Sequence, residues 1–195
     1  MDEYCRPMRF RASLVTILIF AAGVARTPAA DLSAVFNNTG LRLSGVVVGN
    51  IVEDRAKLSV AAFMQALGPP SRMRVDGRTQ RFTWDDEGVQ LEAIVQESVP
   101  FAVLFEFANV DSTNQGLIPN QPYRGTLDCL GIKLYAGLQT VGQATFLSAA
   151  GFNKDSGSAS GEVWAVRLEH WVVFLHFSNS GVIDSAVIRV LPDIY

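Results

Sequence analysis

Two histidines, one acidic run and one cysteine are the side chains of this sequence best suited to chemistry. His170 and His176 are its two histidines, and no Cys-x-x-Cys pair accompanies them. Zinc sites use three or four ligands drawn from His, Cys and carboxylates. The run Asp85-Asp86-Glu87 lacks the alternate spacing and the distant glutamate of a calcium loop. The sequence therefore predicts no metal site.

Catalytic motifs are absent as well. The sequence contains no Gly-x-Ser-x-Gly elbow and no phosphate-binding glycine loop. Cys129 follows Leu127 with the alternation of a strand, and no neighbouring cation would lower the pKa of its thiol, so we expect a buried, unreactive cysteine. These observations favour a protein that is not an enzyme and that uses no cofactor.

The segment Trp171–Phe177 (WVVFLHF) has two apolar faces. One face carries Trp171, Val173, Leu175 and Phe177, and the other carries Val172, Phe174 and His176. An antiparallel strand with one wet face normally alternates apolar with polar residues. The second face is therefore expected to be covered, either by another part of this chain or by a partner.

Two further groups are candidates for binding. Asp85 and Asp86 form either a solvated turn or a contact with a cation or a basic partner. A second hypothesis places a small-ligand site, or a hydrolase site, in a crevice between two halves of the chain. His176 would then act together with Arg167, Glu169 or Asp184.

These residues are positioned by two similar successions of elements. The first has a strand at 41–48 and a helix at 60–67, which Ser59 caps and Gly68 ends. Three strands follow as a meander, at 79–84, 89–95 and 101–107. The second has a strand at 125–134, a helix at 140–150, and strands at 162–168, 171–177 and 182–190. The segments at 31–40, 49–57, 71–78 and 153–161 are interpreted as lead-in, connector and loops.

The spacing indicates an internal repeat. Phe105 follows Gly68 at the same separation at which Ile188 follows Gly151. We therefore predict an α+β fold of two tandem modules, each a helix packed on an antiparallel β-meander. The first module spans 31–108, a linker spans 109–124, and the second module spans 125–195.

Composition and the N-terminus bear on location. The chain has 195 residues, 49% of them hydrophobic, and a net charge of −3, which gives no basic field for nucleic acid. Arginines precede the apolar run at 14–24, so residues 1–30 are predicted to be a signal peptide. Cleavage is expected after Ala25, Ala29 or Ala30, and no lipidation cysteine ends the run. The product would be periplasmic or extracellular without a membrane span; an uncleaved anchor is the alternative.

Two motifs carry a resemblance to known families. They are Leu67-Gly68-Pro69 and Trp84-Asp85-Asp86-Glu87-Gly88, within the order helix, stop, loop and strand. This pattern resembles the helix–β-meander units of the SmpA/OmlA outer-membrane lipoproteins, the tandem units of the β-lactamase-inhibitor-protein type, and bacterial secreted proteins of uncharacterised family. The chain lacks the lipoproteins' cysteine and the inhibitor's disulfides. The resemblance implies a binding module.

The sequence thus favours a secreted, non-enzymatic protein-binding or envelope-associated module. Its expected partner is another protein; no nucleic acid partner and no stable membrane span after signal cleavage are expected. The predicted binding residues are Trp171, Phe174, His176, Asp85 and Asp86.

Overall fold

The structure, a computed structural model, describes residues 32–96, 99–108, 117–155 and 161–191. The predicted signal peptide and the first half of the predicted linker lie outside these residues. The described residues form two β-sheets and two short α-helices. Within these ranges, no helix has the length and the apolar character needed to span a bilayer.

The first sheet has six strands in the order β10-β9-β1-β2-β3-β4. Neighbouring strands are antiparallel except for β1 and β9, which pair in parallel and so join the two halves of the chain. The strands are β1 (Ser33–Asn37), β2 (Gly40–Leu43), β3 (Val46–Val52), β4 (Arg55–Leu58), β9 (Thr126–Cys129) and β10 (Ile132–Leu134).

The second sheet has eight antiparallel strands in the order β11-β12-β13-β14-β8-β7-β6-β5. Two four-stranded meanders meet in it through the pair β14–β8. The strands are β5 (Arg72–Asp76), β6 (Thr79–Trp84), β7 (Val89–Ile94), β8 (Val99–Glu106), β11 (Asn153–Asp155), β12 (Glu162–Arg167), β13 (Trp171–Phe177) and β14 (Ile183–Val190). A 3₁₀ turn, η1 (Asp85–Glu87), connects β6 to β7.

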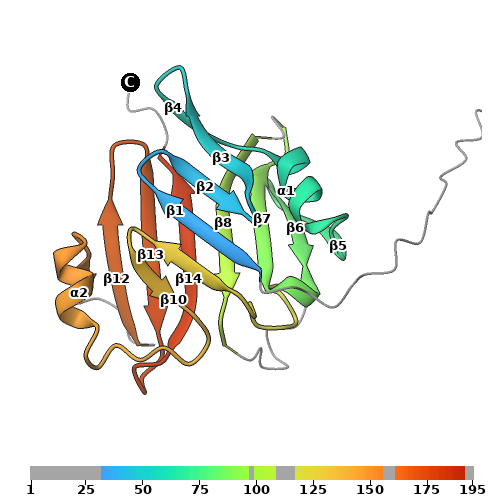
Figure 1. Ribbon diagram of the computed structural model, residues 1–195. Coiled ribbons are helices and arrows are strands. Elements are labelled where there is room, and N and C mark those ends of the chain that lie inside the picture. Colours follow the sequence, from blue (N-terminus) through green and yellow to red (C-terminus); the bar gives the residue numbers. More distant parts are fainter. Residues whose placement is uncertain (1–31, 97–98, 109–116, 156–160, 192–195) are drawn as a thin grey trace, which may run out of the picture.

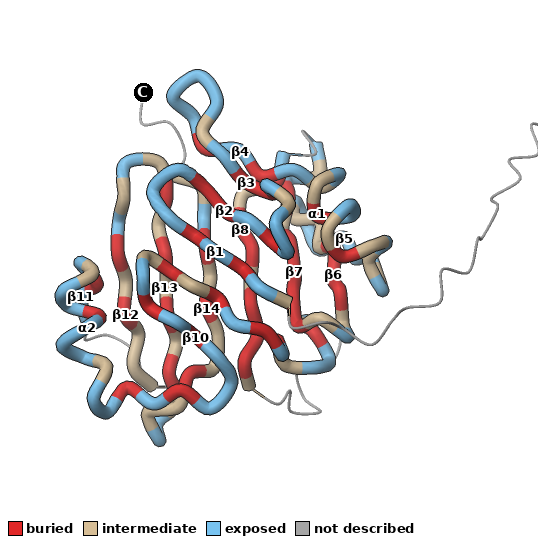
Figure 2. Tube along the Cα trace, viewed as in Figure 1, coloured by how far each residue is buried: buried red, intermediate tan, exposed pale blue. Residues whose placement is uncertain are grey.

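The two sheets stack face to face with their strands crossing, and the six-stranded sheet covers the middle of the larger one (Figure 1). Trp171 on β13 is fully buried, and its ring forms a T-shaped pair with that of Phe36 on β1, with ring centroids 5.6 Å apart. A side chain on Gly49 of β3 would crowd Trp171, since a Cβ there would lie 3.2 Å from its ring. The core is therefore the layer between the sheets, and buried residues follow the central strands (Figure 2).

The helices flank the six-stranded sheet on the same side of the larger sheet (Figure 1). In α1 (Val60–Leu67), the buried Phe63 stacks on Trp84, with ring centroids 5.8 Å apart. The Trp84 indole N–H donates to the carbonyl of Gly68 at 2.8 Å, which fixes the end of α1 on β6. On the other flank, α2 (Ala144–Ala149) buries Leu147 near β12.

One order of elements occurs twice along the chain: a hairpin, then a helix, then a four-stranded meander. The hairpins β2–β3 and β9–β10 have the same kind of turn, in which two successive residues adopt a left-handed backbone conformation. Ser44 and Gly45 have φ of 46° and 83°, and Leu130 and Gly131 have φ of 54° and 84°. Origin by duplication of one unit stays a prediction.

The predicted fold class is wrong. The described chain is mostly β, with both meanders in one sheet and a second sheet across it, and so it is not two helix-on-meander modules. The error lies in polar segments interpreted as loops. The lead-in contains β1, the connector contains the end of β3 and most of β4, and two loops contain the edge strands β5 and β11. The edge strands β5 and β11 are short and largely exposed, so no buried apolar face marks them.

Several local predictions are confirmed. Ser59 caps α1, since its hydroxyl accepts the Ala62 N–H at 3.2 Å, and Gly68 ends the helix with a φ of 78°. The strand β13 has the predicted bounds. Cys129 is buried, and burial raises the pKa of its thiol to about 12.

Candidate functional site

The larger sheet has an inner and an outer face. On the inner face, Trp84 meets α1 and Trp171 meets the six-stranded sheet. Val166, also on the inner face, lies near Gly151 at the end of α2. Both helices and the smaller sheet therefore lie on the inner side, among the elements that the structure describes. On the outer face, Phe174 and Val187 are half-buried, whereas Thr83 and Gln90 of β6 and β7 are only 3% exposed.

The outer face divides into an apolar half and a polar half. On β5, β6 and β7 its side chains are polar or charged, and they include Arg74, Arg81, Thr83, Gln90 and Glu92. On β12, β13, β14 and β8 they are mostly apolar and half-buried. We call the latter set the outer apolar strip: Val163, Ala165, Val172, Phe174, Val187 and Leu104.

Ionisable groups from three neighbouring strands meet at one end of the strip. His176 on β13 lies opposite Ser185 on β14, which in turn lies opposite Glu106 on β8. Asp184 lies beside this row, where the register of β13 and β14 shifts. The carboxyls and the imidazole are close enough to influence one another, because Asp184 interacts electrostatically with both His176 and Glu106.

Burial dominates the titration of this group. It raises the pKa of the Glu106 carboxyl to about 7; the Ala108 N–H opposes the rise by donating to that carboxyl, and Asp184 adds to it. Burial also raises the pKa of Asp184 and lowers that of His176. Each shift favours the neutral form, as expected for charges held at the edge of an apolar surface.

The structure separates the predicted binding residues of β13. Phe174 and His176 lie half-buried on the outer face, whereas Trp171 is completely buried on the inner face. The prediction that Trp171, Val173, Leu175 and Phe177 form one buried face is confirmed. Val172, Phe174 and His176, on the opposite face, are half-buried.

The predicted acidic site lies elsewhere, in η1. The Asp85 carboxylate pairs with the Arg72 guanidinium through two hydrogen bonds, of 3.0 and 3.1 Å. It also accepts the backbone N–H of Asn120 at 2.9 Å, while Arg72 donates to the carbonyl of Ile118. Asp85 therefore anchors β5 and the linker to the β6–β7 turn. Asp86 is exposed next to it.

The residues proposed for a crevice also separate. His176 and Asp184 belong to the ionisable end of the strip. Arg167 and Glu169 lie at the opposite end of the sheet, where they line a cavity of about 960 Å³. No cluster of three or more His, Cys, Asp or Glu side chains suited to a metal exists in the described ranges.

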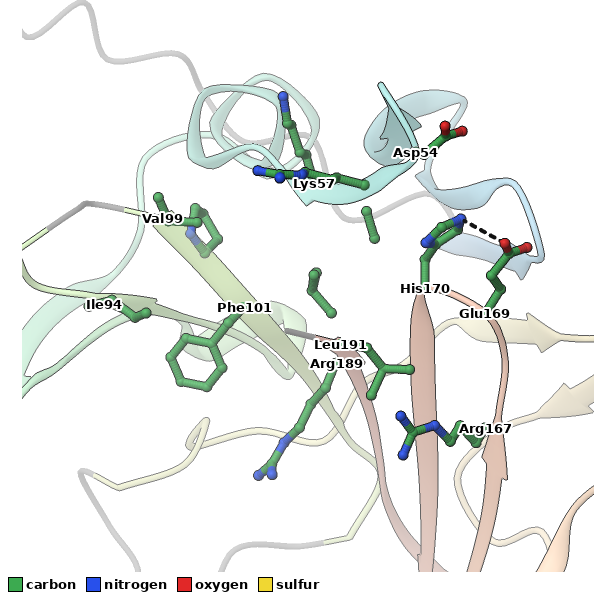
Figure 3. A pocket seen from close by; sticks show the side chains of 14 residues that line it. Asp54, Lys57, Ile94, Val99, Phe101, Arg167, Glu169, His170, Arg189 and Leu191 are labelled. Carbon is green, nitrogen blue, oxygen red and sulfur yellow. Dashed lines mark ion pairs between the residues drawn. The ribbon is translucent and has the colours of Figure 1, made fainter. Parts of the chain in front are cut away.

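This cavity lies where the tip of the β3–β4 hairpin faces the ends of β8, β12 and β14 (Figure 3). The hairpin contributes Asp54, Arg55 and Lys57, and the β12–β13 turn contributes Glu169 and His170. The sequence did not identify most of these residues as candidates for a site. The alternation Arg55-Ala56-Lys57-Leu58, with basic residues exposed and apolar ones buried, was the signal that could have identified β4 and its outward cations.

Comparisons with known proteins give a distant structural likeness. No family model matches this chain, and no curated protein matches it in sequence. Among solved structures, a DUF4309 family protein (YjgB) from Bacillus subtilis is similar, with a TM-score of 0.40 and 10% identity. The match covers 76% of this chain and 84% of that one.

Proposed function

We propose that this protein is a non-enzymatic binding module that is exported to the cell envelope and holds a protein partner against the outer apolar strip. One observation carries the proposal: a single sheet face is polar over β5–β7 and apolar over β12–β14 and β8. A face meant only for water would be polar across all its strands. Contiguous apolar surface on a folded protein is characteristic of an interaction site.

The strip has the composition of an interface. Phe174 supplies an aromatic anchor near its centre, and Val187 and Leu104 extend the apolar surface onto the neighbouring strands. Arg167 and Arg189 lie at one end, and Glu106 and Asp184 lie at the other. Apolar centres with polar rims, enriched in aromatic residues and arginine, characterise protein–protein interfaces. We therefore expect a partner with an apolar centre and with acidic residues facing Arg167 and Arg189.

Site-specific photo-cross-linking in the cells that make the protein tests this proposal. A photoreactive phenylalanine analogue replaces Val187 on the strip and, as a matched control, Arg74 on the polar half of the same face. We expect one discrete adduct from position 187 and none from position 74. The Phe174→Asp change should remove the adduct while the circular dichroism spectrum stays that of the wild type.

The proposal fails if position 187 gives no adduct, or if positions 187 and 74 give the same products. It also fails if Phe174→Asp leaves the adduct unchanged in yield. An adduct that contains only a second copy of this chain would show self-association and no foreign partner. That result would also overturn the proposal.

Export is part of the proposed function and has its own test. N-terminal sequencing of the protein recovered from the envelope fraction should begin within a few residues of Ala30, as cleavage after Ala25, Ala29 or Ala30 requires. A mature protein that keeps Met1 would indicate the uncleaved anchor.

A further inference from the structure

The smaller sheet ends in a short strand, β10, whose far edge is open. β9 lies on one side of β10, and no described strand lies on the other. A two-residue turn joins β9 to β10, so Cys129 and Ile132, which flank the turn, form a hydrogen-bonded pair. Lys133 is therefore in the next position, where the backbone N–H and C=O point away from β9. No other described segment forms a backbone hydrogen bond with either group.

A groove of about 550 Å³ lies at this open edge, and α2 forms its other wall. The two elements lie on the same flank of the molecule (Figure 1). Two aromatic residues of the lining are exposed: Tyr135, after β10, exposes 48% of its surface, and Phe146, on α2, exposes 63%. Leu138 adds a buried apolar side chain to the lining. The groove is on the inner side of the larger sheet and so is separate from the outer apolar strip.

A groove between a sheet edge and a helix is suited to an extended peptide. A peptide strand beside β10 would pair with the N–H and C=O of Lys133, as in recognition by strand addition. Because side chains alternate along a strand, every second side chain of such a peptide would point to the interior side of β10, where the apolar lining lies. The side chains between them would point to the exposed side.

Lys133 determines which peptide fits. Its side chain lies on the exposed face of β10. The peptide residue that exchanges backbone hydrogen bonds with Lys133 lies directly opposite, with its side chain on the same face, and unlike charges in such a pair are stabilising. Asp128 lies opposite Lys133 on β9, but its carboxylate accepts the Gly131 N–H at 3.0 Å, and no ion pair joins these two described residues.

The same rule disfavours self-association at this edge. A second copy of the chain, paired in the same way, would place Lys133 opposite Lys133, and like charges directly opposite one another are destabilising. Charge complementarity therefore favours a foreign strand that presents a carboxylate.

We propose that the groove between β10 and α2 binds an extended segment of another protein in which an acidic residue stands between two apolar ones. The acidic residue lies opposite Lys133 and exchanges backbone hydrogen bonds with it. The apolar side chains on either side lie in the groove, against Phe146 and Leu138. The inference does not rest on the outer apolar strip.

Fluorescence anisotropy of labelled peptides, titrated with the full-length protein, tests the inference. The reference peptide has the core Thr-Val-Glu-Val-Thr. Replacing its Glu by Lys should weaken binding about tenfold, because the peptide then faces Lys133 with a like charge. Methylating the backbone nitrogen of the Glu should abolish binding, because it removes the N–H that donates to the Lys133 carbonyl.

Exposed protein variants locate the site without disturbing the core. Lys133→Glu should bind the Lys peptide more tightly than the Glu peptide, which reverses the preference of the wild type. Phe146→Ser should weaken both peptides about fivefold or more. Arg42→Glu, an equal charge reversal on the exposed face of β2 in the same sheet, should leave the wild-type preference unchanged. In a nitrogen-15 spectrum, the amide of Lys133 should become protected from hydrogen exchange when the reference peptide binds.

Four results would overturn the inference. They are no measurable binding of the reference peptide, equal affinity for the Glu and Lys peptides, a Lys133→Glu protein that keeps the wild-type preference, and no protection of the Lys133 amide. A dimer in sedimentation that Lys133→Glu dissociates would place a second copy on the edge and would also contradict the inference. None of these results depends on the adduct from position 187, so the inference and the proposed function can fail separately.

Discussion

The guanidinium of Arg189 lies over the ring of Phe174, with its carbon 5.7 Å from the ring centroid. Arg189 also lines the cavity at the β3–β4 hairpin. A cation over an aromatic ring contributes about 0.5–1 kcal/mol at an exposed position. A variant of Arg189 will therefore also change the outer apolar strip, to which Phe174 belongs.

The two buried tryptophans should respond differently to replacement by phenylalanine. The indole N–H of Trp84 donates to Gly68, whereas that of Trp171 is buried without an acceptor among the described residues. Trp84→Phe leaves a carbonyl unpaired, and Trp171→Phe removes an unpaired donor. We expect Trp84→Phe to lower the free energy of unfolding by about 1–2 kcal/mol more than Trp171→Phe does. Urea denaturation measures both, and equal losses would contradict the hydrogen-bond assignment.

Glu106 should make the protein less stable as the pH rises. The folded protein binds the proton of this carboxyl more tightly than the unfolded chain does, since its pKa rises from 4.5 to about 7. Its contribution to stability is therefore complete below pH 4.5 and is lost as the pH rises to about 7, a change of about 3 kcal/mol.

The variant Glu106→Gln isolates this effect. It keeps an acceptor for the Ala108 N–H and cannot ionise, so it should be more stable than the wild type at pH 8 and about equal at pH 4.5. Asp184 titrates in the same direction and His176 in the opposite one, so the difference between the two proteins, and not the wild-type curve alone, is the measurement. A pH-independent difference would refute the assignment.

Asp85 should act on stability through Arg72. Its side chain is only 14% exposed and holds both Arg72 and the linker. Asp85→Ala is expected to lower the free energy of unfolding by about 1.5–3 kcal/mol, the range for hydrogen bonds to charged groups. Arg72→Ala should cost a similar amount, and the double variant should cost less than the sum. Additive losses would show that the pair contributes nothing as a pair.

Replacing the two residues of the β3–β4 turn should stabilise the protein. Glu53 and Asp54 both adopt left-handed backbone, with φ of 53° and 58°. Two-residue hairpin turns of this kind favour Asn-Gly, because most L-residues are strained there. Replacing the pair by Asn-Gly is expected to raise the free energy of unfolding by about 0.5–1 kcal/mol. A decrease in the melting temperature would instead point to a stabilising role of these acids.

What the sequence revealed of the fold depended on the strength of local signals. Ser59 and Gly68 bracket α1 because a cap and a left-handed glycine are local requirements. Strand β13 was recognisable because it is apolar on both faces. Strand β5 is harder to predict. Its apolar residues, Met73 and Val75, are exposed to solvent, so neither face of the strand is buried.

The candidate sites were less predictable because they depend on pairing between distant segments. Nothing local in β4 reveals that this strand will border a cavity together with Val99 and Leu191. Likewise, Phe174 and His176 could be identified as an unusual face, but their neighbours Val187 and Glu106 follow only from the β13–β14–β8 order.

The parallel pair β1–β9 and the pair β8–β14 have a consequence for how the chain must be made. Both join strands of the first half to strands that are synthesised much later. Until the second half arrives, β1 and β8 are each left with an open edge, and open edges recruit other chains into intermolecular sheets. Contacts so far apart in sequence also form slowly. A chain interrupted after the linker would thus be an aggregation hazard, and the nascent first half needs protection until the last strand is in place.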